Sequence, residues 1–217
     1  MSNHSQPQSA RWHVVIPLKA LARAKSRLGL GAARPQLALA MSRDTVDAVA
    51  ACEAVGRIVI VTSDTHIWRS DPARGLAVLG DPGGGLQQAV RTGVAEAERA
   101  SARAGTAVVT GDLPAARSSE LDTAFRFASR HPVSFVADTA GTGTTAFFRR
   151  YDASDLPRFG DQSRLAHLDM GAAELAHPSF LALHRDVDTQ DDLREALSLG
   201  VGPNTRALMG ELHDLPL

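Results

Sequence analysis

Several short apolar runs that alternate with helical patterns constrain the fold of this chain more than any other feature of its sequence. The clearest runs are His13–Pro17, Arg57–Thr62 and Val133–Ala137, in which apolar residues mostly follow one another instead of alternating with polar ones. A continuous apolar run is typical of a strand that is covered on both faces. Further strands are predicted at Leu76–Leu79, Thr106–Thr110, Thr144–Phe148 and Phe180–Asp186.

The segments between these runs have helical periodicity. Pro35–Ala51 places a proline in its first turn, and Ser118–Arg130 opens with serine and carries an early glutamate, as helix starts commonly do. Two more helices are predicted at Leu86–Ala104 and Asp191–Leu199. The alternation predicts an α/β fold with a mostly parallel central sheet flanked by helices. The length of 217 residues suits a single domain, predicted over residues 11–217 after a polar, disordered lead-in at 1–10.

The composition excludes several classes of protein. The net charge of −1 provides no basic field for a nucleic-acid partner. No run of 18 apolar residues is present, so no membrane span is predicted, and the polar start lacks the apolar core of a signal peptide. Cys52 is the only cysteine and has no partner for an internal disulfide, which predicts a reducing, cytoplasmic location.

Carboxylates follow two of the predicted strands, at the edge where open α/β sheets bind their ligands. Asp112 lies in the stretch "TGDLP", and Asp186 and Asp188 follow the last predicted strand. Each alone has an ordinary interpretation, since Asp112 suits a turn, and Asp188 or Thr189 suits the cap of the next helix. Together the three carboxylates could hold Mg²⁺, which usually joins carboxylates to substrate phosphates in phosphoryl or nucleotidyl transfer.

A basic loop follows the first predicted strand. It contains Lys19, Arg23, Lys25 and Arg27, and its two lysines are the only ones in the chain. Such a loop is either a solvated surface or a cradle for a triphosphate.

A glycine-rich stretch, "GDPGGGL" at 80–86, follows the third predicted strand. It is either a loose turn or a place where backbone approaches a ligand closely. The absence of G-x-x-x-x-G-K-[ST] and of G-x-G-x-x-G argues against a P-loop NTPase and a dinucleotide dehydrogenase. The eight histidines form no metal motif, so structural or surface roles are expected, with His167 in a helix and His184 in the last strand.

Five motifs, in order along residues 13 to about 203, resemble those of the CofC/FbiD guanylyltransferases of coenzyme F-420 biosynthesis. They are "IPLKALARAKSRL", "GDLP", "FVAD…GTGTTA", "RFG…S" and "DVDTQDDL". The resemblance implies a single-domain, Rossmann-like (GT-A-like) nucleotidyltransferase fold, similar to that of the molybdenum-cofactor guanylyltransferases. It also implies GTP as substrate, Mg²⁺ as cofactor, and 2-phospho-L-lactate, phosphoenolpyruvate or 3-phospho-D-glycerate as acceptor.

The resemblance also implies roles for individual residues. The metal carboxylates would be Asp112, Asp186 and Asp188. The acceptor acid would be held by Lys25, which also belongs to the catalytic set, and by Thr144, Gly160 and Ser163. GTP would contact Lys19, Arg23, Arg27, Gly84 and Gly85. One departure from the family pattern falls in the glycine-rich loop, where Gln87 stands in place of an expected asparagine.

The implied reaction is direct transfer, in which an acceptor phosphate oxygen attacks the α-phosphorus of GTP and pyrophosphate leaves. Another nucleotidyltransferase of the sugar-phosphate or molybdenum-cofactor type, a GT-A glycosyltransferase, and a non-enzymatic guanine-nucleotide-binding module remain alternatives. The resemblance further suggests that the product passes to the next enzyme of the pathway. The sequence is also compatible with a homodimer through an exposed helix or hairpin.

Overall fold

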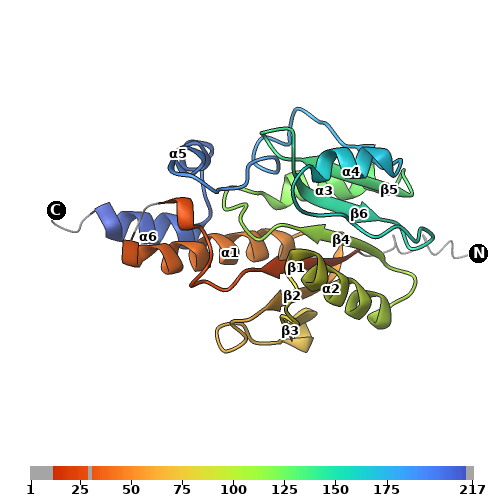
Figure 1. The fold of residues 1–217 in the computed structure, drawn as a ribbon, viewed down its shortest axis with the longest axis horizontal. Coiled ribbons are helices and arrows are strands. Elements are labelled where there is room, and N and C mark those ends of the chain that lie inside the picture. Colours follow the sequence, from red (N-terminus) through yellow and green to blue (C-terminus); the bar gives the residue numbers. More distant parts are fainter. Residues whose placement is uncertain (1–11, 29–30, 214–217) are drawn as a thin grey trace, which may run out of the picture.

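A computed structural model describes residues 12–28 and 31–213 and contains a seven-stranded sheet between helices (Figure 1). The spatial order of the strands is β3-β2-β1-β4-β6-β5-β7. Their bounds are β1 Trp12–Leu18, β2 Val55–Thr62, β3 Leu76–Gly80, β4 Gly105–Val109, β5 Val133–Ala137, β6 Thr144–Arg149 and β7 Ala173–Glu174. Only β6 runs antiparallel to its neighbours, so the predicted mostly parallel sheet is confirmed. The predicted lead-in at 1–10 lies outside the described residues.

Helices cover both faces of the sheet. They are α1 Arg34–Ala50, α2 Leu86–Ala100, α3 Ser118–Ala128, α4 Ser163–Asp169, α5 Gln190–Leu199 and α6 Pro203–His213. Helix α6, which was not predicted, lies alongside α1 (Figure 1). None of the helices within the described ranges is long and apolar enough to cross a membrane.

Strand β1 shows why the predicted strands are continuous apolar runs. Val14 and Ile16 point into the core formed with α1 and α3, whereas Val15 points into the core formed with α2. Successive side chains of a strand alternate between faces, so covering both faces requires apolar residues at every position. Helix α2 approaches β1 so closely that a Cβ added at Gly93 would lie 2.3 Å from Val15 Cγ1.

The prediction of a strand at Phe180–Asp186 is wrong, because Leu181–His184 form turns instead. Side chains, rather than a neighbouring strand, bind the backbone of this segment. The buried Glu120 carboxylate on α3 accepts a hydrogen bond from Leu183 N at 3.0 Å, and the Thr145 hydroxyl donates to Leu183 O at 2.7 Å. Phe180 and Leu183 are buried nonetheless, so the apolar run reports burial and not strand geometry.

Candidate active site

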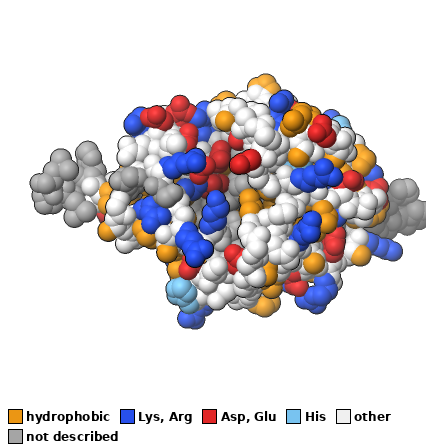
Figure 2. Space-filling view, viewed as in Figure 1, with side chains coloured by type: hydrophobic (Ala, Val, Ile, Leu, Met, Phe, Trp, Pro, Cys, Tyr) orange, Lys and Arg blue, Asp and Glu red, His pale blue; other side chains and the backbone are white. Residues whose placement is uncertain are grey.

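Two adjoining pockets open at the carboxyl ends of β1 and β4. One, of about 140 Å³, is lined by Lys25, Asp112 and Asp188, and the other, of about 190 Å³, by Arg23 and Gly85. The lining residues common to both are Pro17, Leu18, Lys19 and Leu86. Acidic and basic side chains gather side by side near the middle of the face shown in Figure 2. Two of the predicted strand-end carboxylates, Asp112 and Asp188, and three residues of the basic loop therefore line adjoining pockets, whereas Asp186 lines neither.

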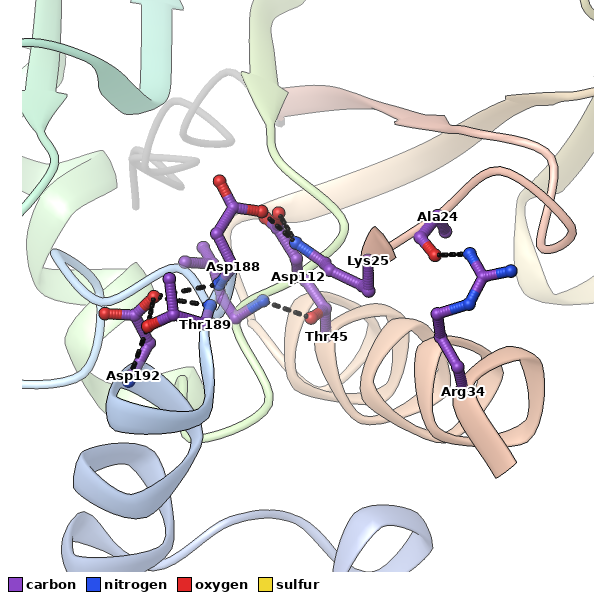
Figure 3. Close-up of polar contacts among 9 residues, drawn as sticks. Ala24, Lys25, Arg34, Thr45, Asp112, Asp188, Thr189 and Asp192 are labelled. Atoms are coloured by element: carbon purple, nitrogen blue, oxygen red, sulfur yellow. Dashed lines mark hydrogen bonds and ion pairs between the residues drawn. The ribbon is translucent and has the colours of Figure 1, made fainter. Parts of the chain in front are cut away.

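Lys25 links two of the predicted carboxylates in what we call the ionic cluster: Lys25, Asp112 and Asp188 (Figure 3). Lys25 Nζ lies 2.5 Å from Asp112 Oδ2 and 2.8 Å from Asp188 Oδ1. Burial opposes the charged form of the lysine, but the two carboxylates outweigh it and raise the pKa of Lys25 above its usual range. Lys25 has φ +56°, a left-handed conformation that L-residues rarely adopt. The ammonium ion is thus held in place by both its charge partners and the local backbone.

The strand end that carries Asp112 is anchored on both sides. A Cβ added at Gly111 would lie 2.1 Å from Leu18 Cδ2, so a side chain at this position would require Leu18 to move. Leu113 N donates to the Thr45 hydroxyl of α1 at 3.0 Å. The Asp112 carbonyl accepts a bond from Val187 N at 3.1 Å, which ties the "GDLP" turn directly to the Asp186–Asp188 segment.

Thr189, and not Asp188, caps helix α5. Thr189 Oγ1 accepts from Asp192 N, and the Asp192 carboxylate accepts from Thr189 N at 2.7 Å, which forms a capping box (Figure 3). This cap leaves the Asp188 carboxylate available to Lys25. Asp188 is partly buried, but the charges of Lys25, Lys19 and Arg27 lower its pKa. The sequence left open whether Asp188 or Thr189 caps this helix, and the structure shows that Thr189 does.

Asp186 and Asp112 carry negative charge that nearby protein groups do not fully compensate. Burial, followed by repulsion from Asp112 and Asp188, raises the pKa of Asp186 to about 7. Asp112 Oδ1 is buried and has no hydrogen-bond partner among the described residues. Within the described ranges, no three acidic, histidine or cysteine side chains form a ready-made metal cage. Mg²⁺ usually takes only one or two carboxylates, with water and phosphate oxygens as its other ligands, so these oxygens fit such an ion.

The basic loop lies beside this cluster and is held by a residue that the sequence analysis missed. Lys19 and Arg23 line the second pocket, whereas Arg27 is exposed and lines neither pocket. Arg34, at the start of α1, donates to the carbonyl of Ala24 (Figure 3) and also to that of Ala22. No motif marked Arg34 in the sequence, because its partners are backbone oxygens.

The glycine-rich loop has the backbone that its composition requires. Gly83, Gly84 and Gly85 have φ values of +80°, +81° and +86°, which side chains other than hydrogen rarely allow. Gly85 lines the second pocket and precedes α2, which has no side-chain N-cap. Of the two glycines predicted to contact GTP, Gly85 borders that pocket and Gly84 does not.

His167 bonds one of the predicted acceptor residues, Thr144, and lies on the same helix as another, Ser163. We call His167, Thr144 and Arg158 the imidazole cluster. His167 Nδ1 lies 2.9 Å from Thr144 Oγ1, and Arg158 N donates to His167 Nε2 at 2.9 Å. Ser163 begins the same helix, α4, and its N–H donates to Gly160 O at 3.1 Å.

The imidazole cluster lies at the same edge of the sheet as the ionic cluster. Thr110 N, just before "GDLP", donates to Thr145 O at 2.9 Å, which places Thr144 beside that turn. Gln87 of α2 also reaches this region, donating to Pro157 O and accepting from Phe159 N at 3.0 Å. The departure at Gln87 was the only sequence signal for this link.

Structural similarity defines the class of protein. 4-diphosphocytidyl-2C-methyl-D-erythritol synthase matches with a TM-score of 0.57 and 12% identity, over 88% of this chain and 99% of that chain. The manganese complex of Rv0371c from Mycobacterium tuberculosis H37Rv matches with a TM-score of 0.54 and 21% identity, over the same shares of the two chains. The fold is therefore the nucleotidyltransferase fold, as predicted.

Sequence similarity then identifies the family. Residues 12–213 match the family described as guanylyl transferase CofC like. Phosphoenolpyruvate guanylyltransferase from Streptomyces coelicolor is 43% identical over 206 residues, which cover 93% of this chain and 97% of that relative. The chain belongs to the CofC-like guanylyl transferase family, so the resemblance read from its motifs is confirmed.

Proposed function

We propose that this protein transfers the guanylyl group of GTP to phosphoenolpyruvate and releases pyrophosphate, with Mg²⁺ as cofactor. The observation that carries the proposal is the ionic cluster, where Lys25 lies between Asp112 and Asp188 at the border of the two pockets. The choice of phosphoenolpyruvate among the three acids rests on the name of the Streptomyces coelicolor relative.

The chemistry needs no protein nucleophile. A phosphate oxygen of the acceptor forms a bond to the α-phosphorus of GTP, while the bond from that phosphorus to the bridging oxygen breaks and pyrophosphate leaves with the electron pair. A phosphate oxygen is already ionised at neutral pH, so general base catalysis contributes little. The protein must therefore position two anions and neutralise their charge.

The proposed roles follow from where the side chains lie. Lys19 and Arg23 of the second pocket would neutralise the phosphates that become pyrophosphate, and Arg27 would add to the positive field around them. Asp112, Asp186 and Asp188 would hold Mg²⁺, which supplies charge neutralisation at the reacting phosphates.

Lys25 would contact the acceptor phosphate at the ionic cluster. Thr144, Gly160 and Ser163 would hold the other end of the acceptor acid. The glycine-rich loop with Gly84 and Gly85 would border the nucleotide. These assignments rest on the family motifs, and for Lys25 and Gly85 also on their place in the lining of the two pockets.

The decisive experiment is a matrix of GTP, ATP and CTP against phosphoenolpyruvate, 2-phospho-L-lactate and 3-phospho-D-glycerate, with Mg²⁺ present. We expect pyrophosphate release only with GTP, highest with phosphoenolpyruvate, and a product whose mass equals the acceptor plus GMP. Release of nucleoside diphosphate would indicate a glycosyltransferase instead. Tight guanine-nucleotide binding without turnover would indicate a binding module, and either result would overturn the proposal.

The wider assignments depend on the same reaction. A product that joins GMP to phosphoenolpyruvate contains a phosphoanhydride bond between the two phosphates and is therefore activated, so a following enzyme must use it as a donor, here in coenzyme F-420 biosynthesis. The hand-over to that enzyme, the homodimer and the cytoplasmic location stay predictions.

A further inference from the structure

His167 is a buried polar ring in an aromatic cage on the acceptor side of the site. Its side chain is fully shielded from solvent. The rings of Phe147, Phe135 and Phe159 surround it at centroid distances of 4.8, 5.3 and 5.8 Å. A polar group in such surroundings is costly unless its hydrogen bonds are satisfied. Both of its ring nitrogens have hydrogen-bond partners, so His167 is held by two directed hydrogen bonds as well as by apolar packing.

The two partners determine which nitrogen carries the proton. Arg158 contributes a backbone N–H, which can only donate, so His167 Nε2 must accept. The proton of a neutral imidazole then lies on Nδ1, and Nδ1–H donates to the Thr144 hydroxyl oxygen. Burial, aided by the charge of Arg158, lowers the pKa of His167 to about 4, so the ring is neutral at physiological pH.

This arrangement directs the Thr144 hydroxyl. Because Thr144 Oγ1 accepts from His167, its own proton must be donated elsewhere. Thr144 is buried, and its hydroxyl has no other hydrogen-bond partner among the described residues. The hydroxyl proton of Thr144 therefore has no acceptor among the described residues.

The same ring fixes the other acceptor residues. It holds Arg158 N, two residues before Gly160, and it stands one helical turn after Ser163 on α4. Gln87 binds the backbone on either side of Arg158, at Pro157 and Phe159. The segment that carries Gly160 is therefore clamped between the imidazole and helix α2.

We propose that His167 is a positioning residue that assembles the acceptor subsite by directing the Thr144 hydroxyl toward an anionic oxygen of the phosphorylated acid and by fixing the Arg158–Gly160 backbone. The inference rests on the proposed function, since it assigns the acid to Thr144, Gly160 and Ser163. It names His167 as the residue through which these three act together.

The test separates the two bonds of the ring with three substitutions. His167→Asn places a donor where Nδ1 lies and loses the acceptor at Nε2. His167→Gln places an acceptor oxygen near the position of Nε2 and loses the donor to Thr144. His167→Phe suits the aromatic cage but loses both. KM for phosphoenolpyruvate, KM for GTP and kcat are measured for each variant.

We expect His167→Phe to raise KM for phosphoenolpyruvate about 10-fold or more while KM for GTP stays within about 2-fold. His167→Asn and His167→Gln should each recover part of the loss. Thr144→Val should add little to His167→Phe, because both remove the same directed hydroxyl. In the wild-type protein, ¹⁵N chemical shifts should show a neutral ring protonated at Nδ1.

His13 provides a matched control. It is also a buried histidine, but it lies in β1 and its Nδ1 is bonded only to the Ala97 carbonyl, at 2.8 Å. His13→Asn should lower thermal stability without changing the ratio of the two KM values. Equal changes of both KM values in His167→Phe, or a ring protonated at Nε2, would overturn the assignment. A wild-type enzyme without turnover would instead overturn the proposed function.

Discussion

The ionic cluster and the imidazole cluster lie at the same edge of the sheet but are held together by opposite physical means. In the ionic cluster, formal charges face one another, and Asp188 is more than half exposed, at 57% of its side chain. In the imidazole cluster, the neutral His167 ring bonds the Thr144 hydroxyl and the backbone N–H of Arg158, and both His167 and Thr144 are buried. The first can exchange partners with ions and phosphates, whereas the second has a geometry fixed before the substrate arrives.

This difference matches the two tasks of the proposed reaction. Bringing two anions together requires positive charge that responds to the substrate. Distinguishing one small acid from another requires polar groups at fixed positions, because an unpaired buried group penalises the wrong ligand. Substitutions in the two clusters should therefore have different effects. Those in the ionic cluster should change kcat and the response to Mg²⁺, whereas those in the imidazole cluster should change the affinity for the acceptor.

The largest effect is expected from Asp112→Asn. The substitution removes a negative charge just after β4, close to Asp186 and Asp188. It should lower kcat by 100-fold or more, which corresponds to about 3 kcal/mol of transition-state stabilisation. Pyrophosphate release under saturating substrates measures it. Asp191→Asn is the control, since Asp191 is exposed on α5 and pairs only with Arg194. Turnover of Asp112→Asn near the wild-type rate would contradict a catalytic role for the ionic cluster.

Lys25→Met should have the next largest effect, and it tests whether charge holds the ionic cluster together. Without the ammonium ion, Asp112 and Asp188 repel each other, so the free energy of unfolding should fall by about 2–3 kcal/mol. Added Mg²⁺ should then raise the melting temperature more in the variant than in the wild type, because it compensates the same charge.

Lys19→Met is the matched control for that experiment, because Lys19 is the only other lysine and is exposed. It should change neither the stability nor the response to Mg²⁺ appreciably. If both variants respond to Mg²⁺ like the wild type, the carboxylates of the ionic cluster do not bind the ion.

The comparison also shows how far the sequence could be interpreted. Asp112 could be placed at the ligand edge because a fully apolar run ends just before it, and apolar runs covered on both faces mark sheet strands. The same rule failed at Phe180–Asp186, because a turn bonded to Glu120 buries its apolar residues as fully as a strand would. The hydrophobicity of a segment indicates that it is buried. Its backbone conformation here depends on hydrogen bonds to side chains far away in the sequence, such as Glu120.

The imidazole cluster was beyond prediction for a related reason. The tautomer of His167 is set by its hydrogen bonds to Arg158, nine residues earlier, and to Thr144, on strand β6. Nothing in the local pattern around His167 distinguishes it from His13, which is also buried and bonded. Lys25 was predictable in part. As one of only two lysines it could be selected as a candidate from the sequence, but its position between Asp112 and Asp188 could be seen only in the structure.

Gln87→Leu should have a smaller effect, confined to the acceptor side. The substitution removes the bonds to Pro157 O and Phe159 N, so the segment before Gly160 is held by His167 alone. KM for phosphoenolpyruvate should rise about 5-fold with little change in kcat, as expected for loss of ordinary neutral hydrogen bonds. Gln88→Leu is the control, because Gln88 is exposed on the same helix. An equal rise in both variants would show that helix α2, and not this link, sets the affinity.

The last effect concerns the stability of the protein and leaves its turnover at neutral pH unchanged: it is a pH dependence of stability that arises from His167. Its pKa is about 4 in the folded protein and about 6.5 when exposed, so between these values the unfolded chain binds a proton that the folded protein does not. Stability from this group is therefore complete above pH 6.5 and is lost as the pH falls toward 4, by about 2 kcal/mol at pH 5.

Urea unfolding at pH 7.5 and pH 5 checks this, with His167→Asn for comparison. The other titrating groups, including Asp186, contribute to both proteins, so the difference between them isolates the imidazole. The wild type should lose about 2 kcal/mol more than the variant on acidification. An equal loss would mean that His167 takes up its proton as readily in the folded protein as in the unfolded one. The contrast between a charged and a neutral cluster would then fail, because the second cluster would also carry charge.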